Sequence, residues 1–94
     1  MTLDWTPIAT QDLRAAYDYV AEDSVTAAEA LLDRIFAVVE RLEQYPRMGR
    51  GGRVDGTREL VIAGTPFVVV YRVGPKRVDV IAVLHAARRW PEEF

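Results

Sequence analysis

The feature that most restricts the fold of this chain is a change in hydrophobic period at residues 46–57. Before this segment, apolar residues recur every three or four positions, which is typical of amphipathic helices. After it, they alternate with polar residues or form short continuous runs, which is typical of β-strands. The segment itself contains four glycines and three arginines, so we predict a surface loop. The chain therefore divides into a helical half and a sheet half.

Two helices are predicted in the first half, after a short strand at residues 3–5. A threonine–proline pair opens the first helix, which ends near Glu22, because proline has no amide hydrogen to lose at the first helical position. Either Ser24 or Thr26 caps the second helix, which ends near Gln44 before a proline. Because the connection between the helices is short, we expect an antiparallel hairpin.

Three strands are predicted in the second half, at residues 58–63, 67–73 and 78–84, separated by turns that contain glycine and proline. The order is therefore β-α-α-β-β-β. This order predicts an α+β fold in which an N-terminal strand and a two-helix hairpin pack on a mainly antiparallel sheet. The length of 94 residues fits one domain, which we predict over residues 1–94.

The charges are unevenly distributed along the chain. Residues 1–44 carry nine acidic and three basic side chains, whereas residues 45–94 carry five acidic and nine basic ones. The total net charge of -2 argues against a general nucleic-acid binder. No cysteine is present, which excludes a disulfide scaffold and cysteine-based zinc or nucleophile chemistry. No signal peptide or membrane-spanning run is visible, so we expect a cytoplasmic protein without a membrane partner.

The candidate chemistry lies in the second half. His85 is the single histidine, so a metal site is not expected, and a role as general base requires a partner such as Glu59. The alternative for His85 is a structural or capping role. Trp90 either folds back onto the sheet or anchors a partner. The arginines that could together recognise phosphates or an acidic protein are Arg50, Arg53, Arg58, Arg72, Arg88 and Arg89.

Several motifs resemble those of the ParE/RelE superfamily of toxins and follow one another in the same order. They are Trp5-Thr6-Pro7 with Asp12-Leu13, Tyr45-Pro46-Arg47-Met48-Gly49-Arg50, Gly56-Thr57-Arg58-Glu59-Leu60-Val61, Val70-Tyr71-Arg72-Val73 and Val83-Leu84-His85-Ala86-Ala87-Arg88-Arg89-Trp90-Pro91. The resemblance covers nearly the whole chain. It implies the toxin half of a bacterial type II toxin–antitoxin pair, with the same β-α-α-β-β-β layout.

The superfamily implies two mechanisms. ParE-like members bind DNA gyrase and are not nucleases, whereas RelE-like members enter the ribosomal A site and cleave mRNA. RelE-like members usually carry a central-strand arginine where this chain has Val68. They also tend to carry a His-Tyr pair where this chain has Ala87 and Arg88. These two departures favour the ParE branch.

The resemblance to the ParE branch implies a non-catalytic gyrase inhibitor that is neutralised by a cognate antitoxin, with no cofactor and no direct DNA contact. The partner-binding residues would be Arg50, Arg53, Arg58, Arg72, His85, Arg88, Arg89 and Trp90. The alternative is a RelE-like endoribonuclease that acts on ribosome-bound mRNA. Its catalytic residues would be His85, Arg72, Arg58 and Glu59. A third possibility is an inactive relative that binds only the antitoxin.

Overall fold

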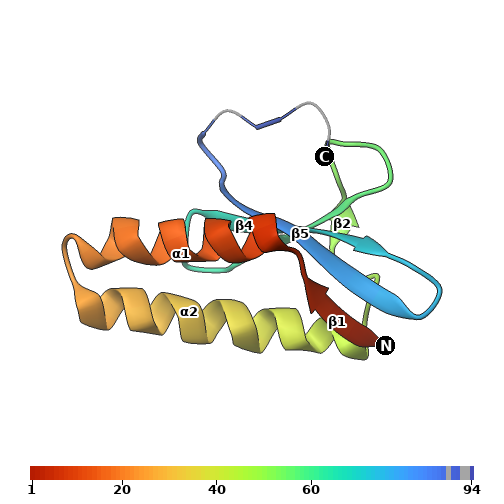
Figure 1. The fold of residues 1–94 in the computed structure, drawn as a ribbon, viewed down its shortest axis with the longest axis horizontal. Helices are drawn as coiled ribbons and strands as arrows, with labels where there is room; N and C mark the ends of the chain where they lie inside the picture. The colour runs from red at the N-terminus through yellow and green to blue at the C-terminus, as the bar shows by residue number, and fades with distance from the viewer. Residues whose placement is uncertain (89, 92–93) are drawn as a thin grey trace.

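The structure is a computed structural model that describes residues 1–88, 90–91 and 94 (Figure 1). Its elements follow the predicted order, with one short strand and one 3-10 turn added. They are β1 (Thr2–Trp5), α1 (Pro7–Ala21), α2 (Val25–Glu40), η1 (Arg41–Glu43), β2 (Arg50–Gly51), β3 (Arg58–Val61), β4 (Phe67–Val73) and β5 (Arg77–His85). The predicted α+β architecture is confirmed.

The two helices begin where the sequence places their caps. The Thr6 hydroxyl accepts the Ala9 N–H at 3.1 Å, and Pro7 occupies the first position of α1. Ser24, rather than Thr26, caps α2 by accepting the Ala27 N–H at 3.1 Å. The second helix does not continue to Gln44, because its last turn tightens into the 3-10 turn η1.

The sheet has the order β1-β5-β4-β3-β2. Only the pairing of β1 with β5 is parallel, and the other three pairs are antiparallel. The prediction that residues 46–57 form only a loop is wrong at one place, because Arg50 and Gly51 pair with Glu59 and Arg58 as strand β2. Two residues are too few to give a hydrophobic period, so the sequence pattern carries no sign of this strand.

The strand β5 contains an irregularity that matters for the site. Val70 pairs with Ala82, whereas the next residue, Tyr71, pairs with Val80, so Ile81 is an extra residue in β5. The bulge reverses the alternation of side chains along β5. As a result, both Val80 and Val83 belong to the core beneath the helices.

The two faces of the sheet are covered differently. Helices α1 and α2 lie together on one face (Figure 1), where Leu60, Val69 and Tyr71 join the helix residue Ile35 in the main core. On the other face, Val68, Val70 and Ala82 are buried outside that core cluster. The loop between β2 and β3 and the chain after β5 approach each other in Figure 1, and their contacts are described below.

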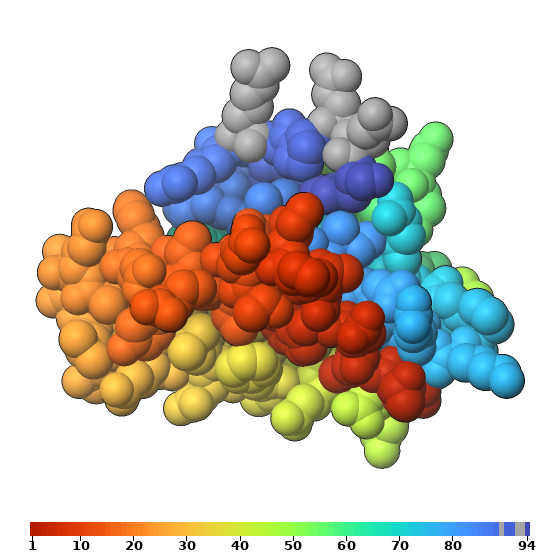
Figure 2. Space-filling view, in the orientation of Figure 1, coloured from red at the N-terminus to blue at the C-terminus, as the bar shows by residue number. Residues whose placement is uncertain are grey.

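The space-filling view shows the helical hairpin at one end of the molecule and the β4–β5 turn at the other (Figure 2). The chain after β5, in dark blue, lies along the upper side of this view. Within the part of the chain that the structure describes, neither helix has the length and apolar character needed to cross a membrane.

Candidate functional site

His85 lies at the end of β5, opposite Phe67 of β4. The two rings meet edge to face with centroids 5.6 Å apart. The imidazole Nδ1 accepts the Ala87 N–H at 3.1 Å, so the ring caps the turn that follows β5. Since Nδ1 uses its lone pair in this bond, the proton of a neutral ring must lie on Nε2. The ring therefore has no free nitrogen lone pair to serve as a general base in this arrangement.

Glu59 does not lie beside His85. The sequence-based pairing of these two residues as acid and base required β3 to pair with the last strand, but β4 lies between β3 and β5. The Glu59 side chain is only 2% exposed. Its Oε1 accepts from Arg50 Nη2 at 3.0 Å, and its Oε2 accepts the Arg53 N–H at 2.7 Å. The condition under which Glu59 could act as the partner of His85 is therefore not met.

Arg53 joins this buried carboxylate to the C-terminal segment. Its Nε lies 3.8 Å from Glu59 Oε2, and its Cζ lies 3.7 Å from the centroid of the Trp90 ring. This is a close cation–π contact. The Trp90 indole Nε1 in turn donates to the His85 carbonyl at 3.1 Å. A continuous series of contacts, which we call the clasp, therefore runs from Glu59 through Arg53 and Trp90 to His85.

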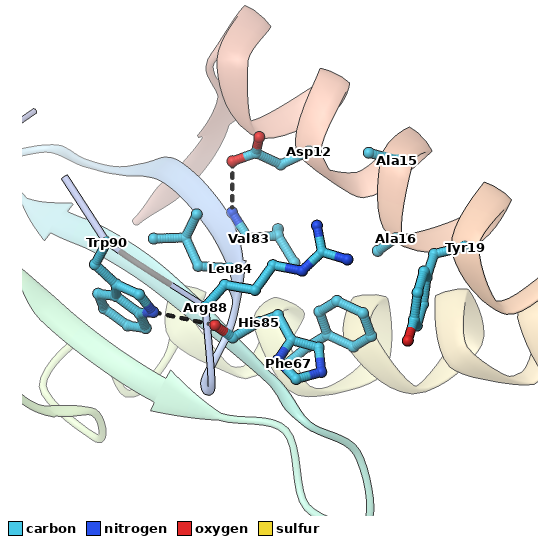
Figure 3. Close-up of a pocket in the computed structure, with 10 residues that line it drawn as sticks. All are labelled: Asp12, Ala15, Ala16, Tyr19, Phe67, Val83, Leu84, His85, Arg88 and Trp90. Atoms are coloured by element: carbon cyan, nitrogen blue, oxygen red, sulfur yellow. Dashed lines mark hydrogen bonds between the residues drawn. The ribbon is translucent and has the colours of Figure 1, made fainter.

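A pocket of about 180 Å³ lies between α1 and the end of β5, and the clasp residues His85 and Trp90 form part of its lining (Figure 3). Its floor is apolar, and its polar groups come from Asp12, Tyr19, His85 and Arg88. The Arg88 side chain extends across the pocket toward Tyr19 in Figure 3, with its Cζ 5.4 Å from the tyrosine ring. The pocket therefore combines a small apolar cavity with one cation and one carboxylate at its edge.

The carboxylate of Asp12 is held at the pocket by a hydrogen bond from β5. Strand β1 ends at Trp5, so β5 has no strand partner on this side beyond Val80. Asp12 Oδ2 accepts the free Val83 N–H there at 3.1 Å. Partial burial raises the pKa of Asp12, while the hydrogen bond from Val83 acts in the opposite direction. Asp12 is not among the predicted site residues, because the sequence pattern does not show that the β1–β5 pairing ends before Val83.

The predicted arginines fall into separate groups. Arg50 and Arg53 surround Glu59, and Arg88 lies at the pocket. Arg58 and Arg72 lie near the end of β4 that is remote from the pocket, and neither forms an ion pair with Glu59. The remaining predicted residue, Arg89, lies outside the residues that the structure describes. The clasp and the pocket therefore connect Arg50, Arg53, His85, Arg88 and Trp90, whereas Arg58 and Arg72 lie outside this connected set.

Arg58 and Tyr71 hold the segment that leads into β2. The buried Tyr71 hydroxyl accepts the Gly49 N–H at 2.9 Å, and Arg58 Nη1 donates to the Gly49 carbonyl at 2.8 Å. Burial raises the pKa of Tyr71, against smaller opposing effects of the Gly49 hydrogen bond and the Arg58 charge. A Cβ at Gly49 would lie 2.6 Å from the Tyr71 hydroxyl oxygen. Gly49 is therefore explained by packing against Tyr71.

A metal site is not apparent in the described residues. Among residues 1–88, 90–91 and 94, no group of three or more histidine, aspartate or glutamate side chains is arranged to hold a metal ion. The clasp and the pocket offer hydrogen-bond donors, cations and apolar surface. This chemistry suits the recognition of a side chain from another protein.

Comparison with known proteins shows the family of this chain. Residues 3–90 match the model of the family described as the ParE toxin of the type II toxin–antitoxin system parDE. The chain is 38% identical to the protein Y4kP of Sinorhizobium fredii over 88 residues, which cover 94% of this chain and 91% of Y4kP. It is 36% identical to the toxin RelE2 of Caulobacter vibrioides over 84 residues, which cover 89% and 93% of the two chains.

Solved structures show the same fold. A chain in the structure of the chromosomal ParDE toxin–antitoxin system from P. aeruginosa superposes with a TM-score of 0.79 and 32% identity, covering 88% of this chain and 92% of that one. The YoeB/ParE toxin from Agrobacterium tumefaciens superposes with a TM-score of 0.57 at 23% identity, covering 88% and 95% of the two chains. The second likeness concerns the fold alone.

Proposed function

Because this chain belongs to the ParE toxin family of type II toxin–antitoxin systems, we propose that it inhibits DNA gyrase by binding and that a cognate antitoxin neutralises it. The observation that supports binding over catalysis is the state of the two candidate acid–base groups. His85 uses Nδ1 to cap a turn, and Glu59 is held by Arg50 and Arg53. Action on gyrase implies that the protein works in the cytoplasm.

The alternative, mRNA cleavage, needs a general base, a general acid and a cation that stabilises the phosphate in the transition state. In this chain Val68 occupies the central-strand position where RelE-like members usually carry an arginine. His85 and Glu59 also lie on strands separated by β4. These features support a ParE-like mode of action, in which the protein blocks its target without breaking a covalent bond itself.

The pocket lined by His85, Arg88 and Trp90 is our candidate for the contact with gyrase. Its volume of about 180 Å³ suits one side chain of a partner protein. Arginine and tryptophan are also the residue types that contribute most often to interface energy. The clasp supports this site, because Trp90 and the His85 carbonyl belong to both. Arg50 and Arg53 would contribute mainly by holding Trp90 in place.

A gyrase supercoiling assay with the purified chain tests the proposal. We expect the wild-type protein to inhibit supercoiling, the cognate antitoxin to restore it, and Arg88→Ala to weaken inhibition by about tenfold or more. Arg14→Ala is the matched control, because Arg14 is an exposed arginine of α1 paired only with Asp18. Absence of inhibition, together with codon-phased cuts in translated mRNA, would establish the RelE-like alternative. Absence of growth arrest on expression would support the inactive relative.

A further inference from the structure

The arginines of the sheet half differ in whether a carboxylate neutralises them. Arg50 and Arg53 lie within 4.0 Å of Glu59, and Arg77 lies 2.9 Å from Asp79. Within the described part of the chain, Arg47 and Arg58 form no such ion pair. These last two charges are therefore available to an external anion.

Arg47 and Arg58 line one hollow of about 270 Å³ at the end of β4 that is remote from His85. The hollow is completed by Gly51, Gly56, Thr57 and Val73. Arg58 Nη1 is fixed by the Gly49 carbonyl at 2.8 Å, which orients the guanidinium before any ligand arrives. The two glycines have no side chains to fill the space. The hollow therefore offers a carboxylate group two guanidinium partners, at least one of them held in position.

A second hollow of about 540 Å³ adjoins the first and shares Arg47 with it. It is lined by Arg41, Tyr45, Pro46, Arg47 and Met48. The Tyr45 and Met48 side chains are large apolar groups that are 57% and 37% exposed. An aromatic ring beside a methionine and two arginines is a typical composition for the centre of a protein interface.

We propose that the two hollows form one docking surface for an acidic, amphipathic segment of the cognate antitoxin. An apolar side chain of that segment occupies the hollow at Tyr45, and a carboxylate occupies the hollow between Arg47 and Arg58. This inference rests on the proposed function in that it takes the antitoxin as a partner. It adds Arg47 and Tyr45, which the sequence analysis did not select as binding residues.

The charges nearby favour a protein segment over a nucleic acid. Glu40 and Glu43 are exposed on either side of Arg41, so an extended polyanion would meet repulsion next to the second hollow. A short segment with one or two carboxylates can avoid both glutamates. The apolar lining of the second hollow also calls for an apolar side chain.

The docking surface is separate from the candidate gyrase contact. Val73 lines the first hollow and pairs with Val78, whereas His85 lines the pocket and pairs with Phe67. These positions are six residues apart along β4, or about 20 Å. The two hollows have no lining residue in common with the pocket. Changes at Arg47 should therefore affect the antitoxin and leave gyrase inhibition intact.

Isothermal titration calorimetry with the full-length antitoxin tests this surface. We expect Arg47→Glu and Tyr45→Ala each to raise the Kd by about tenfold or more, and the control Arg14→Glu to leave it within about twofold. Raised salt should weaken wild-type binding more than binding of Arg47→Glu. Circular dichroism spectra matching that of the wild type would confirm that the variants fold, and gyrase inhibition should be unchanged in all three.

Wild-type affinity in both Arg47→Glu and Tyr45→Ala would overturn the proposal. So would a loss of gyrase inhibition in Arg47→Glu with an unchanged antitoxin Kd, because the surface would then belong to the target. Binding of a single-stranded oligonucleotide that Arg47→Glu abolishes would assign the surface to nucleic acid instead. If the wild-type chain bound no antitoxin and inhibited no gyrase, the proposed function itself would be wrong. This outcome differs from failure of the docking surface, in which the wild type still binds the antitoxin and the variants bind it equally well.

Discussion

Glu59 is almost completely buried, and a carboxylate in that position requires partners. It obtains them from Arg50 and from both the backbone and side chain of Arg53. The two arginines remain 57% and 50% exposed, so they keep much of their hydration. The free-energy cost of removing these charges from water therefore comes mainly from the glutamate. We interpret Glu59 as the residue that positions Arg53 against Trp90.

Glu59→Gln tests this positioning role. The amide keeps the shape of the side chain, but its NH2 group would face an arginine donor, so we expect stability to fall by about 1–3 kcal/mol. In a Trp5→Phe background, the fluorescence of Trp90 should also change, because Arg53 loses its anchor. Asp18→Asn, which breaks the exposed pair with Arg14, should cost no more than about 0.5 kcal/mol. Equal stability of the two variants and unchanged Trp90 emission would refute the role.

Asp12 gives a prediction for pH dependence. Its folded-state pKa is raised by partial burial, so the native state holds the proton more tightly than the unfolded state does. The stabilising contribution of the protonated form is complete below the unfolded pKa near 3.8 and is lost as pH rises through the folded pKa. Urea unfolding should therefore show wild-type stability falling relative to Asp12→Asn between acidic and neutral pH. A difference that stays constant with pH would contradict the assignment.

At the scale of elements, the sequence predicts the helices and strands whose positions depend on neighbouring residues. The caps at Thr6 and Ser24 and the apolar stripes of the helices place α1 and α2 within a few residues. The long strands β4 and β5 follow from β-branched runs and turn residues. The structure also confirms the order of elements that the family motifs imply. The caps, the helical stripes and the strand runs are each encoded within one segment of about 18 residues or fewer.

The parts of the site that the sequence could not predict depend on strand order and register. The sequence placed Glu59 near His85 only if their strands were neighbours, and sheet order is a non-local property. The bulge at Ile81 reverses the side-chain alternation of β5, so that both Val80 and Val83 face the core. No residue at this position signals a bulge. The sequence pattern therefore indicates which segments carry the candidate residues but does not show which of their side chains come into contact.

The N-cap of α2 gives a test at the scale of one element. The sequence permits either Ser24 or Thr26 as the cap, and the structure uses the Ser24 hydroxyl. Ser24→Ala should lower stability by about 1 kcal/mol, because the Ala27 N–H loses its acceptor. Thr26→Ala, at an exposed position inside the helix, should change stability by less than about 0.5 kcal/mol. Thermal unfolding of both variants would distinguish the residues, and a larger loss in Thr26→Ala would reverse the assignment.

At the scale of the whole molecule, the first strand of the sequence pairs with the last one. Residues of β1 at the start of the sequence pair with β5 near its end, through Leu3 with Val78 and Trp5 with Val80. The Thr6 N–H also donates to the Val80 carbonyl at 3.1 Å. Since β5 is also the neighbour of the central strand β4, stability of the whole sheet depends on contacts between the ends of the chain. The acidic helical half and the basic sheet half are thereby held together in one unit.

Trp5→Ala tests this dependence across the molecule. Trp5 is half-buried and meets Phe36 of α2 edge to face, with ring centroids 5.5 Å apart. Its removal should lower stability by about 2 kcal/mol, less than for a fully buried tryptophan. Because β1 completes the sheet, we expect hydrogen exchange of slow amides in β3 to accelerate by about 30-fold, although β3 does not touch β1. Ile8→Ala, at a side chain that is 62% exposed on α1, is the control and should leave those amides unchanged. Acceleration confined to β1 and β5 would instead mean that the N-terminal strand opens independently of the rest of the sheet.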